Sequence, residues 1–181
     1  MTGGEQMIEI RIIDSEHKED IRILNEPFAL FGKMIPSYIN EKWSYDISYW
    51  EKEKITEMCF PEEDYDYETM QNDCVFVGAY EEETCIGLAI LQQRFLKYMY
   101  LYDLKVNSAY RGKNVAADLI KKCKKIALQQ GYRGIYTYAQ DNNLGACKFY
   151  VKSGFYIGGF DSNVYKGTKQ EGKSDIIFYW D

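Results

Sequence analysis

Apolar and polar residues alternate over short stretches in the middle of the chain, and this pattern predicts strands. The segments 74–80, 84–91 and 98–106 read "CVFVGAY", "TCIGLAIL" and "YMYLYDLKV", and they are rich in β-branched and aromatic residues. The connections between them are short, so we expect neighbouring antiparallel strands. An earlier strand is predicted at 7–13, "MIEIRII".

The pattern then changes to a helical period in the stretch 110–127, "YRGKNVAADLIKKCKKIA". Its apolar residues share one face, whereas its lysines lie on the other faces and favour the negative end of the helix dipole. Gly131 is expected to end this helix, because glycine readily adopts the left-handed conformation of a helix terminus. The predicted apolar stripe consists of Val115, Leu119, Cys123, Ile126 and Ala127.

After this helix the pattern predicts a strand at 134–139, a second helix at 142–153 and strands at 155–160 and 174–180. A strand, a crossing helix and a second strand form a local unit whose two strands run parallel. The whole is an α/β (α+β) fold with a mixed, mostly antiparallel central sheet flanked by helices. We expect one domain over 1–181, with a disordered start at 1–6.

The stretch 14–46 follows neither period clearly and contains two prolines, Pro27 and Pro36. Its apolar residues, among them Phe28 and Met34, predict an irregular, partly helical segment that packs on the core. The segment 57–68 holds six acids and no base. It is interpreted either as a solvated loop or as the wall of an electronegative site.

Composition narrows the function classes. A net charge of −6 and a pI near 5.0 disfavour a nucleic-acid surface and favour a cationic partner. No apolar run is long enough to span a membrane, and five widely spaced cysteines without a signal peptide indicate reduced thiols in the cytoplasm. His17 is the only histidine, so neither a metal site nor a serine-type triad is expected.

Candidate chemistry is concentrated where the long helix begins. Arg111, Gly112 and Lys113 precede a helix N-terminus, whose unpaired N–H groups and positive dipole end favour anions. The segment "RGKNVA" lacks the glycine spacing of nucleoside-triphosphate loops and of dinucleotide folds. It can therefore hold a pyrophosphate, although a basic helix start without a ligand is the simpler interpretation.

Two motifs with characteristic residue spacing support the prediction of a pyrophosphate site. A strand, "V-x-x-x-x-R-G-x-x-x-A", a helix, a strand and "N-x-x-A-x-x-F-Y-x-x-x-G-F" occur in this order. The arrangement resembles the GNAT superfamily of acetyl-CoA-dependent N-acetyltransferases, over about residues 72–160. The resemblance implies acetyl-CoA as cosubstrate, no metal, and an acetyl-CoA-binding core that includes Leu104, Lys105, Val106, Arg111, Gly112, Lys113, Asn114, Val115, Ala116, Asn143, Ala146 and Tyr150.

One position departs from that pattern, because the family usually has glycine where this chain has Asn114. Asparagine tolerates positive φ, so the turn is expected to form with a side chain beside the phosphates. Two further stretches, 26–43 and 140–165, resemble the streptothricin acetyltransferases. That resemblance implies acetylation of a β-lysine amine of this antibiotic, and hence resistance to it.

The same resemblance implies roles for individual residues. Tyr150 is expected to protonate the departing thiolate, and backbone groups of Leu104 and Val106 to bind the pantetheine arm and polarise the thioester. Asp103 is a candidate for the base or for anchoring the cationic substrate; a structural acid is the competing interpretation. Because side chains alternate along a strand, Tyr102 and Asp103 are expected to face opposite sides.

Further acids could bind a polycationic substrate, and the sequence does not rank them: Glu62, Glu63, Asp64, Asp141 and Asp161. A thiol nucleophile at Cys147 is disfavoured, since no histidine is available to activate it. Another small amine such as a polyamine, or a protein lysine, stays an alternative substrate. A non-catalytic acyl-CoA sensor is an alternative of another class, and a homodimer is left open.

Overall fold

The computed structural model describes residues 7–94 and 96–181, so the predicted disordered start at 1–6 lies outside the described residues. The chain divides into two compact units. One takes in the chain up to Glu26 together with Phe60–Ile135, and the other Pro27–Cys59 together with Tyr136–Asp181. Each unit combines an early and a late part of the sequence. That the whole chain is one domain stays a prediction.

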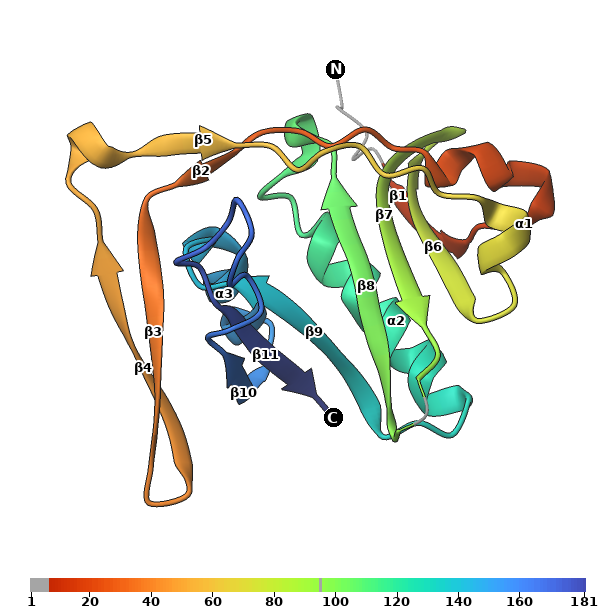
Figure 1. The fold of residues 1–181 in the computed structure, drawn as a ribbon. Coiled ribbons are helices and arrows are strands. Elements are labelled where there is room, and N and C mark those ends of the chain that lie inside the picture. The colour runs from red at the N-terminus through yellow and green to blue at the C-terminus, as the bar shows by residue number, and fades with distance from the viewer. Residues whose placement is uncertain (1–6, 95) are drawn as a thin grey trace. The chain divides into compact units, whose positions relative to one another are not determined.

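Four antiparallel strands form the sheet of the first unit, in the order β1, β6, β7 and β8. The three segments with short connections pair as predicted. The apolar runs of β6 and β7 are buried on both faces of the sheet, whereas β8 is only partly buried. Figure 1 shows these strands side by side. Their bounds are β1 Ile8–Ile12, β6 Cys74–Glu81, β7 Thr84–Gln92 and β8 Tyr98–Val106.

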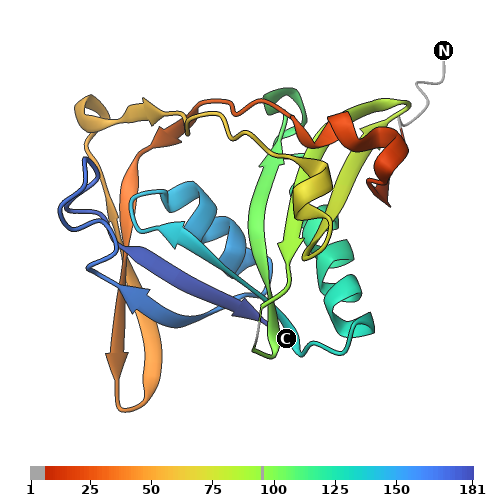
Figure 2. The ribbon, with the colours of Figure 1, turned by 45° about the vertical axis from the view of Figure 1, so that its right-hand side comes forward.

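The long helix α2 (Val115–Gln129) packs across one face of this sheet (Figure 2). All five residues of the predicted apolar stripe are buried, which confirms the helical period. Gly131 follows the helix with φ +83°, the left-handed conformation expected at that position. The opposite face is covered by a 3₁₀ segment, Ser15–Ile21, and by the short helix α1, Tyr67–Met70.

The second unit contains two hairpin-like pairs and a small sheet. Strand β2 (Phe28–Leu30) pairs with β5 (Thr56–Met58), and β3 (Gly32–Ile39) pairs with β4 (Lys42–Tyr49). The sheet has the order β9, β11, β10, and helix α3 belongs to the same unit. The remaining bounds are β9 Gly134–Gln140, α3 Leu144–Lys152, β10 Tyr156–Asp161 and β11 Asp175–Trp180. The first two residues of β9 belong to the first unit. Short 3₁₀ turns lie at Lys52–Lys54 and Ser108–Tyr110.

The prediction of an irregular, helical segment over 14–46 is wrong for most of its length. Only the part near Ser15–Ile21 is helical, and residues from Phe28 onwards form β2, β3 and β4. A two-residue turn, Asn40–Glu41, joins β3 to β4, and both residues have positive φ. This is the turn geometry that favours tight hairpins.

No helix in the described part of the chain is long and apolar enough to cross a membrane.

Candidate functional site

The predicted cofactor loop lies in the first unit, between β8 and α2. Gly112 has φ +78°, and a β-carbon there would have no atom within 4 Å. Asn114 also has positive φ, at 65°, and it caps α2 without a side-chain hydrogen bond to the helix. The helix then begins at Val115, so Val115 and Ala116 contribute N–H groups of its first turn. The turn tolerates Asn114 as expected, and its open side suits an anion.

Two basic side chains flank this turn. The Arg111 guanidinium lies 3.6 Å from the Glu26 carboxylate, and its Nε donates to the Val106 carbonyl at 3.3 Å. Lys113 lies over the ring of Tyr110, 5.0 Å from its centroid. The Arg111 side chain is 42% exposed, so it is accessible to a ligand.

Glu26 is a structural partner that sequence reasoning missed. Its carboxylate accepts a hydrogen bond from the Ser108 N–H and also pairs with Arg111. Eighty-two residues separate Glu26 from Ser108, and no local pattern links them. Glu26 therefore fixes the loop that enters the predicted pyrophosphate turn.

Strand β8 carries the candidate base, and the structure surrounds it with a polar cluster. The Tyr65 hydroxyl donates to Asp103 Oδ2 at 3.0 Å, and Lys105 Nζ lies 3.2 Å from the same oxygen. Lys105 also pairs with Glu63 at 2.8 Å. The side chain of Asp103 is only 17% exposed. We name these four residues, Glu63, Tyr65, Asp103 and Lys105, the Asp103 cluster.

Burial dominates the electrostatics of the Asp103 cluster. Desolvation raises the pKa of Asp103 above its ordinary value, although Lys105 and Tyr65 counteract it. Burial alone would lower the pKa of Lys105, but the charge of Asp103 and the hydrogen bond to Glu63 raise it overall. Burial raises the pKa of Tyr65 as well, so its hydroxyl stays protonated and donates.

The expected alternation along β8 is wrong at Tyr102. The register with β7 shifts between Ile90 and Leu91, which leaves Tyr102 as an extra residue on β8. As a result the Tyr65 ring packs edge-on against Tyr102, 6.1 Å between centroids, while its hydroxyl binds Asp103. Tyr102 and Asp103 therefore both lie against the same tyrosine.

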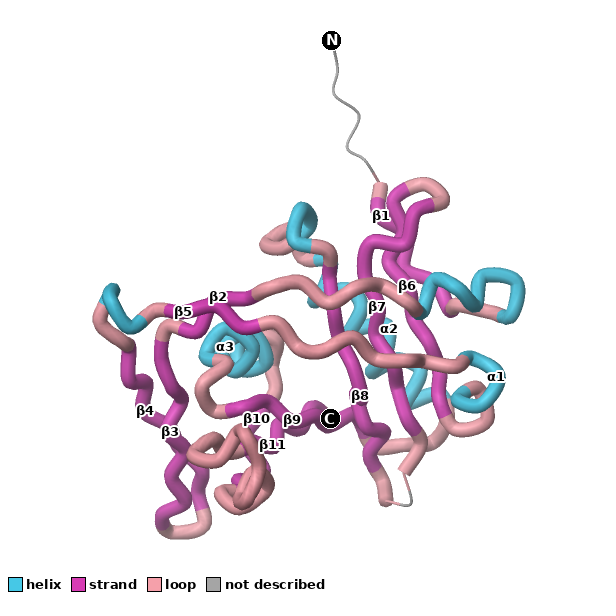
Figure 3. The backbone as a smooth tube through the Cα atoms, turned by 45° about the horizontal axis from the view of Figure 1, so that its top comes forward, coloured by secondary structure: helices cyan, strands magenta, loops and turns pink. Residues whose placement is uncertain are grey.

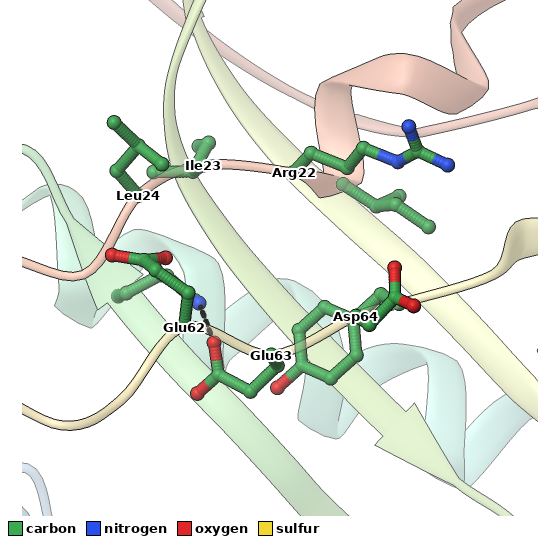
Figure 4. A pocket seen from close by; sticks show the side chains of 9 residues that line it. Arg22, Ile23, Leu24, Glu62, Glu63 and Asp64 are labelled. Atoms are coloured by element: carbon green, nitrogen blue, oxygen red, sulfur yellow. Dashed lines mark hydrogen bonds and ion pairs between the residues drawn. The ribbon is translucent and has the colours of Figure 1, made fainter.

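Most of the acidic segment 57–68 is exposed, and only its two ends belong to β5 and α1. The segments 22–25 and 60–65 run alongside each other past β8, on the side away from α2 (Figure 3). Glu62 accepts from the Asn25 N–H at 3.0 Å, and Glu63 accepts from the Asn25 side chain at 2.9 Å. A cavity of about 130 Å³ lies between the segments (Figure 4), lined by Ile21, Arg22, Ile23, Leu24, Glu62, Glu63, Asp64, Tyr65 and Lys105.

The cavity has a largely apolar side, which also carries Arg22, and an acidic side. Figure 4 shows Ile23 and Leu24 on one segment, with Glu62, Glu63 and Asp64 on the facing one. The structure thus brings three predicted substrate-binding acids to one cavity, together with part of the Asp103 cluster. Arg22 and Lys105 line the same cavity, and Lys105 pairs with Glu63, so the electronegative wall stays a prediction.

In the second unit, helix α3 carries the other motif residues. The Asn143 side chain accepts from the Ala146 N–H at 3.2 Å and so caps the helix, the structural role that competes with cofactor binding. Tyr150 is 8% exposed and its ring packs against Phe149, Phe155 and Phe178. The tyrosine is held by these rings in one orientation.

The two predicted substrate-binding acids of the second unit, Asp141 and Asp161, differ in exposure. Asp141 is fully buried and Lys33 Nζ lies 2.7 Å from its carboxylate. Its other oxygen accepts from the Ser174 N–H at 3.3 Å, so Asp141 connects three separate segments. This geometry favours a structural role over substrate binding for Asp141. Asp161 is exposed at the end of β10 and accepts from the Asn163 N–H.

The structure does not activate Cys147 as a nucleophile. All five are free thiols, and three of them, including Cys147, are buried, whereas Cys59 is exposed. Burial raises the pKa of Cys147 to about 12, so its thiolate is scarce at neutral pH. The residues that the structure describes include no group of three metal-ligating side chains.

Comparison with known proteins supports the motif analysis. The acetyltransferase (GNAT) family model matches residues 39–155. Streptothricin acetyltransferase A of Bacillus subtilis (strain 168) is 30% identical over 162 residues, which cover 90% of this chain and 93% of that protein.

Two solved structures are similar along nearly the whole chain. A protein from Bacillus anthracis str. Ames, provisionally described as a streptothricin acetyltransferase and bound to acetyl coenzyme A, superposes with a TM-score of 0.85. It is 27% identical, with 96% of this chain and 99% of that chain covered. A nourseothricin acetyltransferase has a TM-score of 0.76 at 17% identity, covering 95% and 96%, and this likeness concerns the fold alone.

Proposed function

Since this chain belongs to the GNAT acetyltransferase family, we propose that it transfers the acetyl group of acetyl-CoA to an amine of streptothricin. The predicted family, the α/β fold with a mostly antiparallel sheet and the N-acetyltransferase class are confirmed. The observation that carries the substrate proposal is the 30% identity over 93% of the Bacillus subtilis streptothricin acetyltransferase. The substrate class is accordingly a small cationic molecule, in keeping with the acidic charge of the chain.

Acetyl-CoA supplies an activated acetyl thioester when bound. The residues that would hold its pyrophosphate are Arg111, Gly112 and the N–H groups that follow them. The open left-handed turn at Gly112 fits this role, because any larger residue there would be strained and would crowd the anion. Backbone groups of Leu104 and Val106 would bind the pantetheine arm, as the family resemblance implies.

A proton acceptor is needed because alkylamines are protonated at neutral pH. With a pKa of about 10.4, about one molecule in a few thousand carries the neutral, nucleophilic amine. Asp103 would accept the proton, and its raised pKa makes its carboxylate a stronger base than an exposed aspartate. The acidic side of the adjoining cavity would hold the remaining ammonium groups of the substrate through Glu62, Glu63 and Asp64.

A proton donor is needed for the thiolate that leaves. Tyr150 would supply this proton from its hydroxyl, as the family resemblance implies, and the rings that pack against it support the role by limiting its orientation. A cytoplasmic site of action belongs to the proposal, because the five thiols are free. A homodimer stays an open alternative.

Resistance provides the test. A streptothricin-sensitive bacterium that expresses this chain should grow at concentrations of the antibiotic that stop the same strain with an empty vector. A strain expressing Tyr150→Phe at equal protein level should stay sensitive. Growth of neither strain, with acetyl-CoA binding retained in the purified protein, would overturn the proposal and favour a non-catalytic acyl-CoA sensor.

A further inference from the structure

The Asp103 carboxylate is held by more hydrogen-bond donors than a base alone requires. Two hydrogen-bond donors from different parts of the chain, Tyr65 and Lys105, reach the same oxygen, Oδ2, of Asp103. In the described part of the chain no protein donor contacts the other oxygen, Oδ1. A carboxylate pinned in this way presents one chosen oxygen for proton transfer.

We propose that Tyr65 and Lys105 are positioning residues, which hold the Asp103 carboxylate in one rotamer and keep it ionised so that Oδ1 can accept the proton of the substrate ammonium. The inference rests on the proposed function, because it takes Asp103 as the base. It extends that function by assigning roles to two side chains that contact the base directly.

The cluster is built so that Lys105 cannot leave its place easily. Its side chain is only 10% exposed, and its ammonium is shared between Asp103 at 3.2 Å and Glu63 at 2.8 Å. The ammonium also lies over the Tyr65 ring, 5.2 Å from its centroid. Glu63 is fixed in turn by the Asn25 side chain at 2.9 Å. A continuous series of polar contacts thus connects Asn25, through Glu63 and Lys105, to Asp103.

Charge balance explains why both donors are needed. Desolvation favours a protonated Asp103, and a protonated carboxyl cannot act as a base. The charge of Lys105 and the hydroxyl of Tyr65 stabilise the carboxylate, whereas Glu63 destabilises it. On the neighbouring strand β7 the register partner is Ile90, which is uncharged. In the described part of the chain, Lys105, Tyr65 and Glu63 are the side chains whose charges or hydrogen bonds act on Asp103.

Each substitution has a predicted sign. Lys105→Met and Tyr65→Phe each remove a group that stabilises the carboxylate, so each should move the titration of Asp103 to higher pH. Glu63→Gln removes a like charge and should move it to lower pH. A general loss of stability would not move the titration of Asp103 to higher pH in two variants and to lower pH in the third.

The experiment follows the Asp103 carboxyl directly by carbon-13 NMR of the full chain, with the resonance assigned by its loss in Asp103→Asn. In parallel, kcat/KM is measured from about pH 5 to about pH 9, because its acid limb reports the base of the free enzyme. At the low end of this range, Lys105→Met and Tyr65→Phe should lose several-fold more activity than at the high end. Matched controls are Tyr80→Phe, which removes another hydroxyl that donates to an aspartate, Asp20 at 2.7 Å, and Lys18→Met, which breaks an exposed pair with Glu68.

The outcomes separate the two claims. Carboxyl and acid-limb shifts with the predicted signs, absent in the controls, support the positioning roles. In a second outcome, the carboxyl titration of Asp103 shifts in the variants, but the acid limb of kcat/KM stays fixed or the parent shows no turnover. The contacts would then exist, but Asp103 would not be the base, and the inference would be overturned together with that role. A carboxyl that titrates identically in parent and variants overturns the positioning roles alone, whatever the turnover.

Discussion

Replacing Asn114 by glycine examines the one position where the chain departs from the family motif. Asn114 has φ 65° and ψ 2°, and its side chain makes no capping hydrogen bond to α2. The left-handed region costs an ordinary L-residue roughly 1–2 kcal/mol, and less for asparagine. Glycine avoids this cost but loses about 0.5–1 kcal/mol through the greater freedom of the unfolded chain. The two effects nearly cancel, so Asn114→Gly should change the free energy of unfolding by less than about 0.5 kcal/mol.

Cofactor affinity should change more than stability. The substitution removes a side chain beside the predicted pyrophosphate turn and allows closer approach of the backbone to the anion. We expect the Kd for CoA to fall about three- to tenfold, which corresponds to about 0.7–1.4 kcal/mol. Asn114→Ala is the matched control: it also shortens the side chain but keeps a β-carbon at positive φ, and it should lower stability by about 1 kcal/mol.

Isothermal titration with CoA and with pantetheine, which lacks the diphosphate, provides the assay, and denaturant unfolding provides the stability. Tighter binding of CoA with unchanged binding of pantetheine is the expected result. A weaker CoA complex in Asn114→Gly would mean that the asparagine side chain contributes to binding. An equal gain for CoA and pantetheine would place the effect away from the pyrophosphate.

Three further substitutions address other parts of the account. Arg111→Ala should raise the Kd for CoA about tenfold with little change in melting temperature, because the side chain is 42% exposed; an unchanged Kd in titration would remove Arg111 from the pyrophosphate site. Tyr150→Phe should lower kcat about a hundredfold or more while CoA affinity is kept, and a kcat close to that of the parent would exclude it as the proton donor. Lys33→Met should lower the free energy of unfolding by about 2 kcal/mol, because it leaves the buried charge of Asp141 without its partner while the 38% exposure of Lys33 limits the loss. Denaturant unfolding that shows no change would mean that this ion pair contributes nothing net.

The sequence predicted those elements whose hydrophobic pattern is contained within a short stretch of the chain. The strands β6, β7 and β8 and the helix α2 each bury a face that period and composition reveal within ten to twenty residues. The left-handed conformations of Asn114 and Gly131 were predictable for the same reason, since only a few residue types adopt that conformation.

The hairpin β3–β4 was missed although a local signal existed. Its apolar residues were interpreted as a helical face, and Pro36 as a breaker. Asn40 followed by Glu41 is a two-residue turn with positive φ, and the flanking residues are largely β-branched or aromatic. Pro36 is tolerated because the hairpin is a two-stranded sheet, in which each strand has one open edge.

The Asp103 cluster could not be predicted, because its contacts are distant in sequence. Tyr65 and Asp103 are 38 residues apart, and Glu63 and Lys105 are 42 apart. The register shift at Tyr102 likewise depends on how β8 pairs with β7, which periodicity does not encode. Sequence reasoning therefore identified Asp103 as a candidate but not the groups that set its charge.

Release of free CoA thiol from acetyl-CoA by the purified protein tests the central claim most directly. Streptothricin, spermidine and a lysine-containing peptide serve as parallel acceptors, with Tyr150→Phe as the inactive control. We expect rapid thiol release with streptothricin, much slower release with the other two amines, and an acetylated antibiotic as product. Release with spermidine or the peptide but not with streptothricin would contradict the substrate, and release with none of them would contradict the enzyme.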